Sequence, residues 1–211
     1  MIVHWTLFLP ALALLLVPIA LFHGPKVRYR GIAHDWRDIW KQTFALGLHT
    51  VDFCRATLGA WWLLESLQKG AHATGAMRFA VPATGAAVLL SATLLQTTFR
   101  AKPDSVHAPF VFLGGLVFGF YPPAIAAYAL LLATVTAFGT KAPAVFFPIL
   151  AFALPGVGSL FARGLLPSLV VGSLVALLPW LWSLLFSREM VVSYRGRRPS
   201  EGSSSAHPHR A

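Results

Sequence analysis

This sequence has few charged residues. Charged residues make up 11% of its 211 positions and hydrophobic residues 56%, whereas a soluble domain is about one quarter charged. So little polar surface cannot cover a fold in water, which excludes an ordinary soluble domain. The apolar runs also do not alternate with polar residues, as the strands of a membrane barrel require. We therefore expect an all-α membrane protein.

Cysteine is rare in this sequence, and the common catalytic motifs are absent. Cys54 is the single cysteine, so an intramolecular disulfide and a metal site built from several cysteines are excluded. The sequence has no P-loop, no dinucleotide-binding glycine pattern, no His-Glu-x-x-His and no Gly-x-Ser-x-Gly. These absences favour a protein that is not an enzyme and has no metal site.

The long apolar stretches predict a polytopic transmembrane helix bundle of about seven crossings, because one span needs about 20 apolar residues. Six crossings are the alternative if residues 107–139 form one kinked or re-entrant element. We expect a transmembrane domain over residues 1–187 and a basic, disordered cytoplasmic tail over residues 188–211. The predicted spans are residues 2–23, 40–67, 78–99, 108–120, 123–139, 142–162 and 166–186.

Prolines and positive charges together support seven crossings. Tyr121-Pro122-Pro123 splits residues 107–139, because prolines lack a backbone donor and disfavour helix before them. Pro155-Gly156 predicts a second helix break. Lys and Arg gather in residues 26–41 and from Arg188 onward. Seven crossings with the N-terminus outside place both groups in the cytoplasm, as the positive-inside rule requires, and indicate a bacterial inner membrane.

The net charge of +10 suggests nucleic-acid binding at first sight. Positive charge clustered beside apolar spans is instead typical of membrane topology, so we predict no nucleic-acid partner. The predicted partners are the lipid bilayer, anionic lipid at the basic tail, and other membrane proteins.

His49, Asp52 and Arg55 are the candidate functional residues. They are spaced three apart, which places them on one stripe of a helix. If residues 40–67 span the membrane, Asp52 and Arg55 lie near its midplane, where an ionised group costs roughly 2.5–3.5 kcal/mol. The stripe is then a substrate or ion pathway, a self-satisfied pair that fixes helix packing, or the wet face of an interfacial helix. Gly115-x-x-x-Gly119 predicts close helix packing.

Haem or another pigment on His49 is a minor alternative, and no specific cofactor is predicted. Axial ligation by two histidines needs a second histidine at the same depth. The other candidates fall near predicted span ends: His4, His23, His72 and His107.

The leading functional hypothesis is a non-enzymatic accessory or structural subunit that packs with other membrane proteins. Small size, missing catalytic motifs and abundant small and aromatic residues support it. The alternative is a small transporter or ion- or proton-conducting protein that uses His49, Asp52 and Arg55. An intramembrane enzyme is the third hypothesis.

Overall fold

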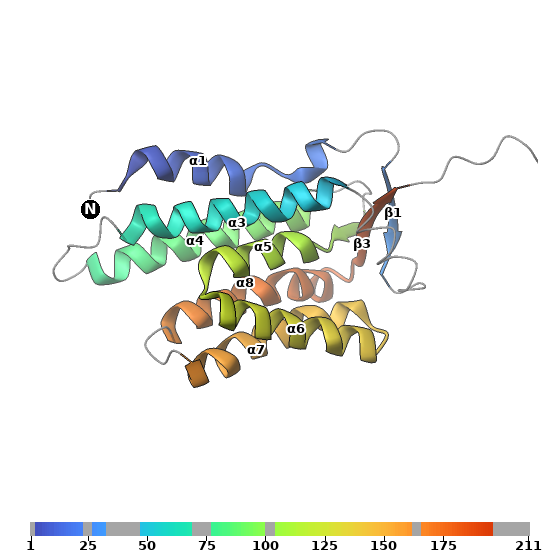
Figure 1. Cartoon of the computed structure of the whole chain (residues 1–211). Coiled ribbons are helices and arrows are strands. Elements are labelled where there is room, and N and C mark those ends of the chain that lie inside the picture. Colours follow the sequence, from blue (N-terminus) through green and yellow to red (C-terminus); the bar gives the residue numbers. More distant parts are fainter. Residues whose placement is uncertain are drawn as a thin grey trace, which may run out of the picture.

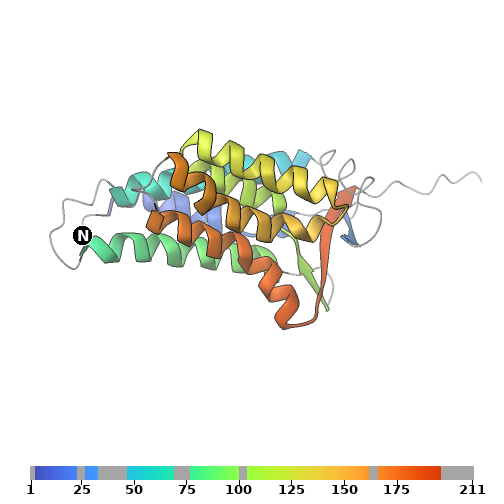
Figure 2. The same cartoon turned by 90° about the horizontal axis from the view of Figure 1, so that it is seen from below.

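The computed structural model describes residues 3–22, 27–32, 47–68, 77–99, 104–161 and 166–195. This part of the chain is mostly helical, and successive helices run in opposite directions along a common bundle axis (Figures 1 and 2). The α-helices are α1 (Trp5–Leu16), α3 (Gly47–Gln68), α4 (Met77–Thr98), α5 (Phe110–Phe120), α6 (Pro123–Gly139), α7 (Phe146–Phe161) and α8 (Leu166–Leu185). Short 3-10 turns follow α1 (η1, Ile19–Phe22) and precede α7 (η2, Pro143–Val145).

A three-stranded sheet closes one end of the bundle, hereafter the sheet end (Figure 1). Its order is β1-β3-β2, with β1 (Val27–Gly31) antiparallel and β2 (Ser105–His107) parallel to the central β3 (Glu189–Arg195). The sequence analysis places residues 189–195 in a disordered tail, and this is wrong. Backbone pairing on both sides and burial of Met190, Val191 and Val192 hold this segment in the sheet. Residues 196–211 lie outside the described residues.

A capped turn joins α8 to the sheet. Ser187 has the left-handed φ of 49°, and its N–H donates to the carbonyl of Leu184 at 3.3 Å. The Arg188 N–H donates to the carbonyl of Ser183 at 3.0 Å. These two bonds form a Schellman motif, which ends the helix and turns the chain into β3.

Two layers of helices form the bundle. In one, α3 packs between α1 and α5; in the other, α7 packs between α6 and α8, and α8 also contacts α4. Glycine brings α5 against α3: a Cβ at Gly115 would lie 2.5 Å from the carbonyl oxygen of Phe53. A Cβ at Gly119 would lie 2.9 Å from the Cβ of Ala60. The backbones of the two helices are therefore in direct contact.

Helices α5 and α6 form a hairpin with Tyr121 and Pro122 at its tip. Tyr121 is extended, and Pro123 opens α6, where its missing N–H costs nothing. The 11 residues of α5 reach about 16 Å at ~1.5 Å per residue, about half of a bilayer core. Figure 1 shows the tip stopping short of the far ends of α3 and α4. The hairpin thus starts and finishes at the sheet end.

Two other predictions about the spans are wrong. A continuous helix over residues 2–23 is interrupted, because Pro18 forces Val17 into an extended conformation (ψ 117°) and α1 ends at Leu16. The break predicted at Pro155-Gly156 does not occur, since α7 continues through it. One proline removes a single hydrogen bond from the helix, and the rest of the ladder keeps it intact. Residues 40–46 of the second predicted span lie outside the described residues.

Length and composition single out two helical stretches in the described part of the chain. Pro143–Phe161 and Pro167–Leu185 have 19 residues each and are long and apolar enough to cross a membrane. Three further helices, α1, α5 and α6, are apolar but shorter. The fold is therefore helical, as the sequence predicts, with a small sheet that the sequence analysis omits.

We expect Gly115→Ala to lower the free energy of unfolding by about 1–3 kcal/mol, because the new methyl group meets the α3 backbone. Gly114→Ala is the matched control, since its Cβ would lie 3.6 Å from the Phe53 ring, an ordinary contact. Denaturant unfolding in detergent, followed by circular dichroism, measures both. Equal stability of the two variants would contradict the close packing of α3 and α5.

Candidate functional site

The end of α1 leaves backbone acceptors without their usual donors. In a regular helix the carbonyl of Leu14 would accept from the residue four positions later, and that residue is Pro18, which has no N–H. The carbonyl of Val17 lies beyond the last helical turn. Helix C-termini also carry partial negative charge. A cationic donor is therefore favoured at this point.

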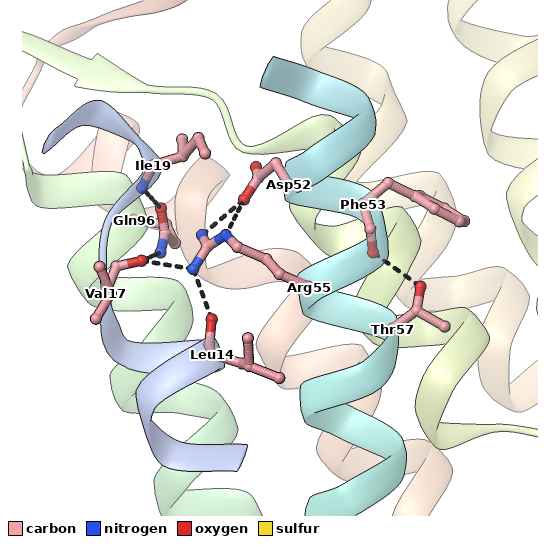
Figure 3. A network of polar contacts seen from close by, with 8 residues as sticks. All are labelled: Leu14, Val17, Ile19, Asp52, Phe53, Arg55, Thr57 and Gln96. Atoms are coloured by element: carbon pink, nitrogen blue, oxygen red, sulfur yellow. Dashed lines mark hydrogen bonds and ion pairs between the residues drawn. The ribbon is translucent and has the colours of Figure 1, made fainter. Parts of the chain in front are cut away.

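Arg55 of α3 supplies that donor. Its Nη1 donates to the carbonyl of Leu14 at 2.6 Å and to the carbonyl of Val17 at 2.5 Å. The other side of the guanidinium faces Asp52, one turn earlier on α3. Nε donates to Oδ1 of Asp52 at 2.6 Å, and Nη2 forms an ion pair with the same oxygen at 2.6 Å. Figure 3 shows Arg55 between the carboxylate and the end of α1.

This ion pair is shielded from solvent. The side chain of Arg55 is 10% exposed and that of Asp52 is 5% exposed. The guanidinium carbon also lies 5.3 Å from the centroid of the Phe112 ring, within the range of a cation–π contact. A buried charge is tolerated only when it is paired and hydrogen-bonded. The carboxylate, the two carbonyls and the ring together meet that condition.

Gln96 of α4 completes the network around the bend. Its Oε1 accepts from the Ile19 N–H at 3.3 Å, and its Nε2 donates to the carbonyl of Val17 at 3.1 Å. One carboxamide thus satisfies a donor and an acceptor on either side of Pro18 (Figure 3). Gln96 is 3% exposed, so the bond to backbone replaces hydration that it has lost.

The three residues of the predicted stripe make their contacts in two different parts of the structure. Asp52 and Arg55 hold the end of α1, whereas His49 contacts the sheet. The His49 Nε2 lies 3.2 Å from the carbonyl oxygen of Ser193, and since a carbonyl only accepts, Nε2 is the donor. At ~1.5 Å per residue, Arg55 lies about 12 Å along α3 from Gly47. Arg55 is thus about 4 Å from the middle of α3, on the side of the sheet end.

A small cavity lies between α3, the sheet and the start of α5. His49, Asp52, His107 and Ser193 contribute to its lining, and its volume is about 10 Å³. A space of this size admits one water molecule and no organic cofactor. The described residues contain no group of three or more His, Cys, Asp or Glu side chains that could hold a metal ion.

Tyr29 borders this polar region from β1. Its ring packs edge-on against His107, with the centroids 6.5 Å apart. Burial raises the pKa of the Tyr29 phenol, so the group is uncharged at neutral pH.

A second and much larger cavity lies beyond the tip of the α5–α6 hairpin. Its volume is about 620 Å³, and its walls come from α3, α4, α8 and the hairpin. Trp61, Leu64 and Phe118 belong to a lining that is mostly apolar. Two hydroxyl groups in the wall are satisfied within the protein. Thr57 Oγ1 donates to the carbonyl of Phe53 at 2.9 Å, and the Tyr121 hydroxyl donates to the carbonyl of Ser168 at 2.6 Å.

In comparisons with protein-family models, curated proteins and solved structures, nothing matches this chain. The candidate sites therefore rest on their own geometry.

Sequence reasoning named Asp52 and Arg55 but missed the acceptors and Gln96. Pro18 carries the signal that could have found the acceptors, since a proline inside an apolar run frees the carbonyl four residues earlier. It also named Tyr121, Pro122 and Pro123 without the cavity that they line. Pro155 and Gly156, named as a second break, lie within α7.

We expect Arg55→Met to destabilise the fold by about 3–5 kcal/mol, because it leaves Asp52 buried without a partner and the end of α1 uncapped. The double variant Asp52→Leu/Arg55→Met should be more stable than Arg55→Met, since the unpaired charge is gone. Unfolding in detergent measures both variants. A stable Arg55→Met protein would contradict the structural role of Arg55.

Proposed function

We propose that this chain is an integral membrane protein, and that it is a non-enzymatic subunit that packs with other membrane proteins. One observation carries the membrane assignment. Helices α5 to α8 contain no Asp, Glu, Lys or Arg, yet they expose large apolar side chains. Leu131, Phe152 and Leu160 are 60%, 74% and 81% exposed. A surface of this kind is stable in lipid and costly in water.

In the proposed topology the sheet end is cytoplasmic. A sheet with open edges cannot lie in hydrocarbon, and positive charge marks the cytoplasmic side. The segments that join helices at the far end, with the first turn of α4, hold Lys69, Arg78 and Arg163. By sequence, thirteen of the 17 Lys and Arg residues lie between α1 and α3, between α4 and α5, between α6 and α7, or after α8, in segments that continue from the sheet-end termini of these helices: Lys26, Arg28, Arg30, Arg37, Lys41, Arg100, Lys102, Lys141, Arg188, Arg195, Arg197, Arg198 and Arg210.

The α5–α6 hairpin re-enters from the cytoplasmic side in this topology. The stretch from α1 through η1, together with helices α3, α4, α7 and α8, then makes five crossings in place of the seven that the sequence suggests. Both numbers are odd, so the N-terminus stays outside and the C-terminus stays cytoplasmic, in the inner membrane of a bacterium.

Exposed aromatic side chains support a role as a subunit. The rings of Tyr128 on α6 and Phe161 on α7 stack in parallel, with centroids 5.7 Å apart. They are 53% and 60% exposed, so the pair presents a flat apolar surface outward. Aromatic residues are enriched in protein interfaces because they bury much area at low entropic cost.

The contacts of the ionisable residues argue for packing over transport. Among the described residues, Arg55 forms its hydrogen bonds, ion pair and ring contact with Asp52, Phe112 and the backbone carbonyls of Leu14 and Val17. A substrate anchor or a relay needs a group that can release its partner and take another. Breaking these contacts would also unfold the end of α1. We therefore place Asp52 and Arg55 in the structural framework.

Single cysteines test the topology. In a Cys54→Ala background, we expect Asp104→Cys at the sheet end to react with a membrane-impermeant maleimide only from the cytoplasmic side. His4→Cys at the far end should react only from outside. Both native side chains are exposed, so access to reagent is not limiting. Wild-type Cys54, exposed on α3, should react only with a lipid-soluble maleimide. Labelling of both new cysteines from the same side would overturn the proposal.

Purification in mild detergent tests the role as a subunit. We expect mass spectrometry to find another membrane protein in a fixed ratio to this chain. The double variant Tyr128→Ala/Phe161→Ala should lose it, because these rings form the proposed contact surface. Leu21→Ala/Phe22→Ala is the matched control, with side chains 58% and 61% exposed beyond α1. Recovery of the wild-type chain as a monomer without a second protein would count against the proposal.

A further inference from the structure

The 620 Å³ cavity beyond the hairpin tip has the size of a ligand site, since such sites range over about 300–1,000 Å³. A re-entrant hairpin explains why it exists. Because α5 and α6 turn back early, the space between the far-end halves of α3, α4 and α8 is not filled by helix (Figure 1). Three other cavities are smaller, with volumes of about 10, 10 and 190 Å³.

We propose that this cavity binds one acyl chain of a lipid from the outer leaflet of the bilayer. The inference rests on the proposed membrane topology. The first argument is chemical. The walls are mostly apolar, and the hydroxyls of Thr57 and Tyr121 donate to backbone carbonyls. A polar cargo would lose its hydration without gaining these donors. An apolar chain has no hydration to lose on entry.

The second argument is length. Along α3 the lining runs from Thr57 to Gln68, which is about 16 Å at ~1.5 Å per residue. One leaflet of a bilayer core is about 15 Å thick. An acyl chain that starts at the outer headgroup level therefore reaches the hairpin tip with its terminal methyl group.

The third argument is access. Trp61 and Phe118 line the cavity and are also 50% and 38% exposed, so the site opens on the outer surface of the bundle. In the proposed topology that surface faces lipid. A chain can therefore enter sideways from the bilayer without crossing water.

The test uses the full chain in nanodiscs of phosphatidylcholine, with a small fraction of phosphatidylcholine that carries a diazirine in mid-chain. After illumination, mass spectrometry locates the label. Label near Phe152, 74% exposed on α7, reports ordinary contact with surrounding lipid. The ratio of label on α3 residues 57–68 to label near Phe152 reports occupation of the cavity.

Filling the cavity should reduce the labelling of the cavity residues without changing the labelling near Phe152. We expect Ala86→Trp, which projects into the cavity from α4, to lower this ratio about tenfold, equivalent to ~1.4 kcal/mol of binding. The neighbouring Ala87 is exposed and does not line the cavity, so Ala87→Trp should leave the ratio unchanged. Val171→Phe fills the cavity from α8 and guards against a folding defect specific to α4.

The outcomes separate the two proposals. An equal ratio in the wild type and in both filling variants would overturn acyl-chain binding while leaving the membrane topology intact. Absence of label near Phe152 would overturn the topology itself. Loss of label with Ala86→Trp and Val171→Phe, but not with Ala87→Trp, supports the inference.

Discussion

The hydrogen bonding of the buried polar groups in the bundle depends on the guanidinium of Arg55. Pro18 stops α1 inside an apolar run and leaves carbonyls without donors. Arg55 supplies those donors from α3, and Asp52 balances its charge. Phe112 covers the group from α5. Three helices are thereby fixed around one planar side chain, and α4 joins them through Gln96.

The two ends of the bundle differ in chemistry. At the sheet end, backbone pairing between strands and the buried histidines His49 and His107 place polar groups around a cavity of about 10 Å³. At the far end, the short α5–α6 hairpin leaves an apolar space. The asymmetry has one origin. Because Tyr121-Pro122-Pro123 turns the chain back early, the end of α5 packs against Thr57 and Ala60 near the middle of α3 and does not reach its last turns (Figure 1).

Much of the helical framework could be predicted from the sequence, because long apolar runs and proline pairs act locally. The helix pair around Tyr121-Pro122 and the start of α8 near residue 166 are examples. The sheet could not be predicted in the same way. Its central strand, β3, pairs with segments more than 80 and 160 residues earlier in the chain, and no local pattern encodes such pairing. The partners of Arg55 were missed for the same reason.

The stripe of His49, Asp52 and Arg55 illustrates how an ionisable cluster should be read in an apolar chain. Its spacing alone suits a relay as well as a structural pair. What distinguishes these two roles is the number of backbone carbonyls around the cluster that lack a hydrogen-bond donor. A proline leaves the carbonyl four residues earlier without its helical donor, and a neighbouring arginine can donate a hydrogen bond to it. Because Arg55 already donates to the end of α1, we expect a site for an exchangeable ligand elsewhere in the protein. The large cavity, with Thr57 and Tyr121 already bonded to backbone, selects its occupant by shape and by the absence of charge.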